Sequence, residues 1–320
     1  MMNAMLACLA TLLTTVLAMP PVMHLAVRIG AVDVPGDRRR MHRHSTPRAG
    51  GLAWMGAVIV GALLFLRGDA LIFRAMAGSV LLLVVGLVDD IKGLTPRSKL
   101  VAQLAASVIV CGLPIDPGRL LAVLWLTLLC NAHNFIDGMD GLLCGCSVFE
   151  STALALCLVR SGEGKLVSLA LLVLSASLGF WIYNRHPAKT FAGDCGSCTV
   201  GYLLGVLSLP LFLRTSSPIQ TLSPFLIFAL PIADMTAAVG RRILRGRSPF
   251  CADRGHLHHR LYDAGFSQTL CVRTLHLLAM LAGMIGVLLR IEGQRMLAAG
   301  GCILLVIAMR GVRKRVLRAG

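Results

Sequence analysis

The sequence predicts an all-α protein, a polytopic bundle of membrane-spanning helices that forms a single domain over residues 1–320. Of these residues, 56% are hydrophobic and only 14% are charged, and the mean hydropathy is +0.78. A soluble domain of this length is far less apolar. Apolar stretches of about 20 residues, enough to cross a hydrocarbon layer of about 30 Å, recur from one end of the chain to the other. No repeat, linker or low-complexity tract divides them.

The apolar stretches predict eleven spans, and ten is the alternative because the fourth and fifth are separated only around Pro114 and Pro117. The first stretch has no Lys or Arg before it, so we expect a retained helix and not a cleaved signal peptide. The spans are expected near residues 3–25, 50–66, 71–88, 98–115, 119–133, 140–160, 165–183, 197–213, 221–240, 271–290 and 295–310.

The basic residues predict the orientation. When each of the 31 Lys and Arg is assigned to its nearest loop or tail, 23 belong to the loops after odd-numbered spans and to the C-terminal tail, and 8 belong to the other loops. By the positive-inside rule, we expect the N-terminus outside and the C-terminus in the cytoplasm. We expect the protein to be located in the inner (plasma) membrane. The formal charge of +16 does not indicate nucleic acid, because the basic residues lie in short loops without a DNA-reading element. We expect them to face lipid headgroups.

The eleven cysteines lie mostly in apolar runs or on the internal side, so we expect free thiols. Cys195 and Cys198 have the spacing of a metal-binding pair, but the sequence lacks a second pair.

The notable polar clusters all fall on the predicted internal side. In the first, Asp89 and Asp90 end an apolar run and are followed by Lys92, Arg97 and Lys99. An Asp near the hydrocarbon costs about 3 kcal/mol, so such a pair needs a cation, a lysine or water. A solvated helix end, with Lys92 pairing locally, is an equally weighted alternative.

The second cluster, residues 131–141, is the most informative. Asp137 and Asp140 are three residues apart, which places both carboxylates on one helix face with Asn134 if Gly138 and Gly141 do not break the helix. A polar hairpin is the alternative, because Asp-Gly steps also suit turns. We weigh the helix above the hairpin.

Two further clusters follow. Asp194 lies between glycines at the start of a small-residue helix, where exposed amides favour an anion or a metal-bound phosphate, and a plain capping role competes. His256, His258 and His259, with Arg260, form a cation-rich patch for a diphosphate, or else a transition-metal site. The carboxylates elsewhere favour Mg²⁺ over zinc.

Weaker candidates lie outside these clusters. Asp33 and His42 belong to a loop for which a basic membrane-surface segment is a better interpretation than a catalytic one. Glu150 and Asp234 lie inside expected spans, and acidic residues there are functional candidates.

In this order, the clusters resemble the polyprenyl-phosphate N-acetylhexosamine-1-phosphate transferases, the family that includes WecA, TagO and MraY. The resemblance covers nearly the whole chain. It rests on Asp89-Asp90 with Lys99, on the Asn-x-x-Asn-x-x-Asp-Gly-x-Asp-Gly element of residues 131–141, on Phe-x-Gly-Asp-x-Gly-Ser at 191–197, and on the histidine loop. His-Leu-His-His after Asp-Arg is similar to the WecA and TagO branch, which implies a simple UDP-HexNAc donor.

The resemblance implies transfer of HexNAc-1-phosphate, with GlcNAc the first choice, from a UDP-sugar to undecaprenyl or another polyprenyl phosphate. The reaction would take place at the cytoplasmic face, release UMP and start a lipid-linked cell-surface glycan. It implies Mg²⁺ as cofactor, with Mn²⁺ as the alternative, and leaves a homodimer open. A phosphate nucleophile approaching a diphosphate crowds negative charge, so catalysis must neutralise and align these groups.

The resemblance also implies a role for each site residue. Asp194 would bind the metal with Asp89 and Asp90 beside it, and one of this pair would act on the lipid phosphate. We expect catalytic roles for Asp89, Asp90 and Lys99, and substrate contacts from Asn131, Asn134, Asp137, Asp140, Asn184, Phe191, His256, His258, His259 and Arg260.

Two rival classes remain. An ion-coupled transporter would use Glu150 and Asp234 inside its spans, but its polar residues should gather at the midplane. A CDP-alcohol phosphotransferase also uses paired aspartates, but its Asp-Gly-x-x-Ala-Arg pattern is absent from residues 137–142.

Overall fold

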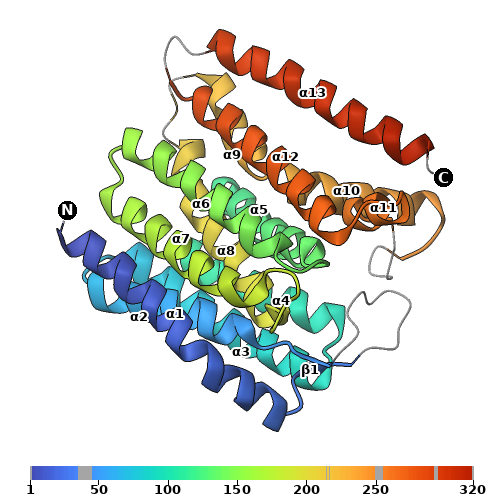
Figure 1. Cartoon of the computed structure of the whole chain (residues 1–320). Helices are drawn as coiled ribbons and strands as arrows, with labels where there is room; N and C mark the ends of the chain where they lie inside the picture. The colour runs from blue at the N-terminus through green and yellow to red at the C-terminus, as the bar shows by residue number, and fades with distance from the viewer. Residues whose placement is uncertain are drawn as a thin grey trace.

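The computed structural model describes residues 2–34, 45–213, 215, 217–248, 255–291 and 295–318, and it is a bundle of long helices (Figure 1). One small antiparallel sheet pairs β1 (Val32–Asp33) with β2 (Thr46–Pro47). The helices are α1 (Met2–Arg28), α2 (Gly50–Phe65), α3 (Ala70–Lys92), α4 (Pro96–Cys111), α5 (Pro117–Ile136), α6 (Leu142–Arg160), α7 (Gly164–Asn184), α8 (Gly193–Leu213), η1 (Pro218–Leu222), α9 (Ser223–Ile227), α10 (Ala229–Leu244), α11 (Leu257–Asp263), α12 (Gln268–Leu288) and α13 (Arg295–Arg318).

The helices start where the sequence supplies caps. Asp69 accepts hydrogen bonds from the backbone amides of Leu71 and Ile72 at the start of α3. Thr95 and Asp116 cap α4 and α5 in the same way, and each is followed by a proline in the first helical turn. A proline there loses no helical hydrogen bond and is already set to the helical φ angle.

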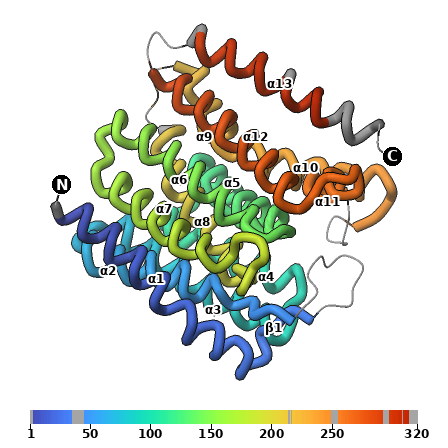
Figure 2. Tube along the Cα trace, in the orientation of Figure 1, coloured from blue at the N-terminus to red at the C-terminus, as the bar shows by residue number. Residues whose placement is uncertain are grey.

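Helix α8 lies at the centre of the bundle, and nearly all of its described side chains are buried. It packs against α2, α3 and α5. Gly86 of α3 and Gly51 of α2 face Cys195 and Gly196 so closely that a Cβ atom at either glycine would overlap the backbone of α8. Small residues allow this approach, as is common where membrane helices pack. The chain trace in Figure 2 places α1 to α3 at one edge and α12 and α13 at the other.

The predicted fold class is confirmed as an all-α polytopic membrane protein. Among the described residues, seven helices are long and apolar enough to cross a membrane, or eight if the segments on either side of Phe228 form one span. A helix lies at each of the eleven expected positions, but α2 and α4 have only 16 residues each. Eleven crossings, and the orientation of the ends, remain predictions. The segments expected as the fourth and fifth spans are two separate helices, α4 and α5.

One expected span differs from the structure. We predicted a continuous helix near 221–240, but η1 with α9 meets α10 at an angle of 77°. Pro224 and Pro231 lie on either side of the break, and neither can donate a backbone hydrogen bond. The break turns α10 towards α5 and α12, which both pack against it.

Candidate active site

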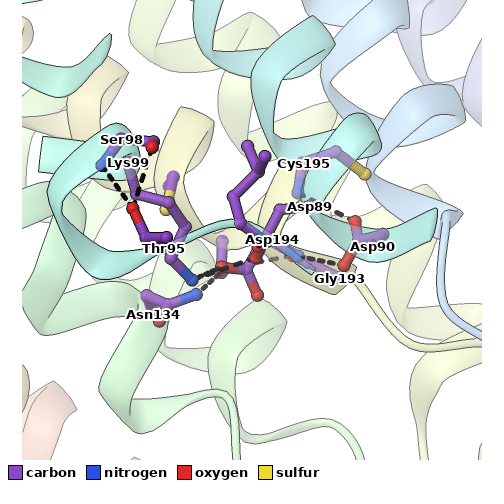
Figure 3. A network of polar contacts seen from close by, with 12 residues as sticks. Asp89, Asp90, Thr95, Ser98, Lys99, Asn134, Gly193, Asp194 and Cys195 are labelled. Atoms are coloured by element: carbon purple, nitrogen blue, oxygen red, sulfur yellow. Dashed lines mark hydrogen bonds and ion pairs between the residues drawn. The ribbon is translucent and has the colours of Figure 1, made fainter. Parts of the chain in front are cut away.

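Three carboxylates and two cations meet at the end of the bundle where α3, α4 and α8 come together. Figure 3 shows the three carboxylates together with one of the cations, Lys99. Lys99 Nζ donates to Asp89 Oδ2 at 3.0 Å and to Asp194 Oδ2 at 2.5 Å. The backbone amide of Leu94 donates to the other oxygen of Asp89. Asp89 and Asp194, 105 positions apart in sequence, therefore share one lysine and lie side by side, as the resemblance implied.

Asp90 differs from Asp89 because it is fully enclosed. Its carboxylate accepts hydrogen bonds from the backbone amides of Asp194 (2.9 Å) and Cys195 (3.1 Å), the first turn of α8. Its side chain is 0% exposed. A carboxylate at a helix N-terminus satisfies free amides and complements the helix dipole. Asp90 therefore holds the first turn of α8 and orients Asp194, and the catalytic role expected of Asp90 stays a prediction.

Arg48 is a site residue that the sequence analysis missed. Its Nη2 atom lies 3.0 Å from Asp90 Oδ1 and donates to Asp194 Oδ1 at 3.3 Å. Burial opposes its charged form, but Asp90 and Asp194 outweigh that effect and raise the pKa of the guanidinium. The one feature of the sequence that could have indicated Arg48 is the Gly50-Gly51 pair that follows it closely. In the structure, β2 and the backbone amides of both glycines form hydrogen bonds with residues 191–192.

The donor set fits a hard cation. Asp89 and Asp194 both point at Lys99, so their oxygens converge on one point, and Mg²⁺ takes one or two carboxylates together with water and phosphate. Among the described residues, no three His, Cys, Asp or Glu side chains are arranged as a complete metal site. Phosphate oxygens would have to complete the coordination. The described cysteines are free thiols, as expected.

Residues 137–141 form a hairpin, so the helical alternative that we weighted more heavily is wrong. Helix α5 ends at Ile136, and Gly141 has a φ of +79°, a left-handed conformation that glycine adopts freely. Asp137 lies near the carboxylate cluster. Burial, then the charge of Asp194, raise its pKa to about 7.

Asp140 and Asn184 hold this hairpin in place. Asp140 Oδ2 accepts hydrogen bonds from His186 Nδ1 (2.7 Å) and the amide of Ala188 (3.1 Å). Asn184 accepts from the amide of Gly141 and donates to the carbonyl of Thr190. Because Asn184 is 2% exposed and bonded on both sides, the structure gives it a positioning role. The predicted contact of Asn184 and Phe191 with a nucleotide stays a prediction.

The two asparagines of α5 face the cluster at different depths. Asn134 Nδ2 donates to Ser197 Oγ at 2.9 Å, beside Asp194 on α8 (Figure 3). Asn131 lies one turn deeper and exchanges hydrogen bonds with Gln103 of α4. Asn134 is therefore the nearer of the two to the carboxylates.

The histidine loop reaches the same end through α11. His256 Nδ1 and the amide of Leu257 both bond to the carboxylate of Asp234, each at 2.7 Å. His258 packs so closely on Gly138 that a Cβ atom there would overlap the imidazole. Asp234, predicted inside a span, thus anchors the loop, and Gly138 leaves space for His258.

The predicted cationic patch needs one correction. Burial and then neighbouring His259 lower the pKa of His258 to about 3, so its imidazole is neutral near pH 7. A neutral imidazole can donate or accept a hydrogen bond but supplies no positive charge. His259 is also buried, and Arg260 is exposed on α11. Asp33 pairs with Thr46 in the small sheet, and His42 lies outside the described residues.

Charged groups thus gather at one end of an apolar bundle, and comparison with known proteins supports the class of membrane phosphoglycosyl transferases. Residues 72–211 match the family model described as Glycosyl transferase family 4, a range that begins within α3, ends within α8 and contains Asp89, Asp90 and Asp194. The chain belongs to the polyprenyl-phosphate N-acetylhexosamine-1-phosphate transferase family, and the resemblance predicted from its motifs is confirmed.

Three relatives support this assignment. A probable undecaprenyl-phosphate N-acetylglucosaminyl 1-phosphate transferase of Bacillus subtilis (strain 168) is 32% identical, over 91% of this chain and 86% of the relative. A decaprenyl-phosphate N-acetylglucosaminephosphotransferase of Mycobacterium tuberculosis (strain ATCC 25618 / H37Rv) is 33% identical, over 84% and 78%. An undecaprenyl-phosphate alpha-N-acetylglucosaminyl 1-phosphate transferase of Yersinia pestis is 30% identical, over 82% and 78%.

Proposed function

We propose that this protein transfers N-acetylglucosamine-1-phosphate from UDP-N-acetylglucosamine to undecaprenyl phosphate, or a polyprenyl phosphate of similar length, at the cytoplasmic membrane face. The names of the three relatives support the sugar and the lipid. The observation that carries the proposal is the carboxylate cluster, in which Lys99 joins Asp89 to Asp194 at the polar end of the bundle. The transporter alternative is not favoured, because membership of a transferase family argues against it.

The chemistry needs charge neutralisation more than a strong base. A lipid phosphate oxygen attacks the β-phosphorus of the UDP-sugar, and the bond from that phosphorus to the bridging oxygen breaks. UMP leaves with the bridging oxygen, and the lipid carries a diphosphate linked to the sugar. A phosphate monoester is already largely ionised near pH 7, because its second pKa is about 6. An aspartate beside it therefore acts chiefly through its charge.

The residues of the cluster would divide this work. Mg²⁺, held by Asp194 and Asp89, would neutralise charge on the diphosphate and on the leaving UMP. Lys99 and Arg48 are 27% and 32% exposed, so both reach the opening of the site and are placed to bind phosphate oxygens. Asn134, Asp137 and neutral His258 line the same end and would orient the donor by hydrogen bonds.

The test is UMP release by the purified full-length protein with polyprenyl phosphate and a panel of UDP-sugars. We expect turnover with UDP-N-acetylglucosamine that EDTA abolishes and Mg²⁺ restores. Asp116→Asn is a matched control, because Asp116 caps α5 through Arg119 outside the cluster, and asparagine caps as well as aspartate. Absence of UMP release with every UDP-sugar, from protein that is folded, would contradict the proposed function.

A further inference from the structure

A groove of about 430 Å³ lies between the polar end of α7 and the start of α12. Its lining comes from α7, from the first turns of α12 and from the hairpin at Asp140 and Gly141. None of the residues that hold the carboxylate cluster lines it. Of its lining residues only Asp140 is a predicted substrate contact, so the groove lies beside the candidate active site and outside its carboxylate cluster.

The groove is polar at one end and apolar below. Helix α7 runs towards the polar end of the bundle and α12 runs away from it, so Arg185 and Arg273 lie near the same level. Leu178 and Ile182, one to two turns deeper on α7, are 40% and 51% exposed. Both helices are long and apolar enough to span the membrane. This gradient matches a bilayer lipid, whose charged headgroup lies above its apolar chains.

The charge in the groove is positive. Within the part of the chain that the structure describes, neither Arg185 nor Arg273 has a carboxylate partner. Asp140, the one carboxylate of the lining, is bonded to His186 and to the amide of Ala188. Two arginines at the level of the headgroups, with no acid to balance them, attract a phosphate.

We propose that this groove is a binding site for an anionic glycerophospholipid, with its phosphate between Arg185 and Arg273 and an acyl chain along Leu178 and Ile182. A water-soluble phosphate compound would leave the exposed apolar wall uncovered. The lipid acceptor of the reaction is the less suitable occupant, because its phosphate would lie away from Asp89, Asp194 and Lys99. The bound phospholipid joins the ends of α7 and α12 next to Asp140, and so stabilises the hairpin that carries Asp137.

Tryptophan fluorescence can test this site directly. The chain has three tryptophans. Trp54 and Trp125 are 0% and 8% exposed, whereas Trp181 lines the groove. The full-length protein is placed in phosphatidylcholine vesicles that contain a minor fraction of brominated phosphatidylglycerol or, separately, of brominated phosphatidylcholine. We expect quenching of Trp181 to give about a tenfold higher apparent affinity for the brominated phosphatidylglycerol.

Variants assign the effect to the groove. Arg185→Gln combined with Arg273→Gln should abolish the preference, and Trp181→Phe should remove the lipid-dependent quenching. Arg28→Gln, which changes an exposed arginine at the end of α1, should leave the preference unchanged. Equal quenching by both lipids, or a preference that survives in the double variant, overturns the proposal.

A competition arm separates the two lipid sources. Unbrominated phosphatidylglycerol should reverse the quenching, and polyprenyl phosphate at the same fraction should reverse it less. The opposite order would make the groove an acceptor-lipid site and would overturn the proposal. Turnover is not measured in any of these experiments. Failure of the lipid-site proposal therefore does not bear on the proposed transferase reaction, and failure of the transferase test does not bear on the lipid site.

Discussion

Two of the buried groups of ionisable side chains in the described part of this bundle differ in how their charges are balanced. At the polar end, Asp89, Asp90 and Asp194 meet Lys99 and Arg48, and both cations are partly exposed. In the interior, His133 of α5 faces Glu150 of α6 at 2.9 Å, and their side chains are 0% and 1% exposed. The first group has an excess of negative charge and an opening, whereas the second is closed.

The closed pair is neutral overall. His133 Nδ1 lies 2.8 Å from the carbonyl of Leu129, which can only accept, so this nitrogen carries a proton. Nε2 and Glu150 Oε2 then share one further proton, and the pair has no net charge wherever that proton lies. A site that binds a cation and phosphates needs uncompensated charge that solvent and ligands can reach. A buried pair with a structural role must instead have no net charge.

Asp194→Asn should have the largest effect on turnover, because it removes a negative charge from the group in which carboxylates outnumber cations. We expect the UMP release rate to fall by at least about 10³-fold, since the remaining carboxylates hold a cation less well. The measurement is turnover at saturating Mg²⁺. Size-exclusion elution and thermal unfolding in detergent should match the unaltered protein. Near-normal turnover would remove Asp194 from metal binding.

Asp234→Asn should reduce turnover by about 10 to 100-fold, the range found when a partner that orients a site residue is lost. Asp234 bonds to His256 and to the amide of Leu257, so the change weakens the anchor of α11 and leaves the carboxylate cluster intact. We therefore expect the Mg²⁺ concentration for half-maximal activity to stay the same. A large shift in that concentration would mean that the two halves of the site are not independent.

Much of this site was predictable because its residue types are unusual beside apolar helices. Asp89, Asp194 and the histidines stood out, and their order along the chain carried the resemblance. Arg48 did not, because it is one of several arginines in a basic loop and its carboxylate partners are distant in sequence. Only the pairing of residues 46–51 with 190–192 brings it to the cluster.

The errors in the predicted fold have a common cause. Amino-acid composition indicates which segments are buried, but it does not indicate the conformation of their backbone. The three-residue spacing of Asp137 and Asp140 suits a helix and a hairpin equally, and the left-handed conformation of Gly141 decides for the hairpin. The segment around Phe228 is apolar throughout, so hydropathy could not reveal the 77° break. The deep apolar helices, whose identity rests on length and hydropathy, were located correctly.

Asp137 allows a smaller, pH-dependent test of the open group. Its pKa is raised to about 7 by burial and then by Asp194, so it is mostly protonated at pH 6 and mostly ionised at pH 8. Ionisation strengthens the negative field at the cluster, so apparent Mg²⁺ affinity should rise by up to about tenfold over this range. Activity titrated with Mg²⁺ at each pH measures it. Asp137→Asn should flatten the dependence, and an equally steep dependence in that variant would assign it to another group.

The closed pair gives the smallest expected effect on turnover and so tests the comparison from its other side. Glu150→Leu leaves His133 buried without its partner, which should cost about 3 kcal/mol of stability. Replacing both residues by leucine removes the polar groups together, so the double variant should recover most of that loss. Thermal unfolding in detergent measures stability, and UMP release per folded protein should stay within about twofold in both variants.

His133 immediately precedes Asn134, which bonds to Ser197 beside Asp194. If Glu150→Leu lowers turnover by tenfold while the protein remains folded, the pair acts through Asn134 on the site and the distinction between open and closed groups fails.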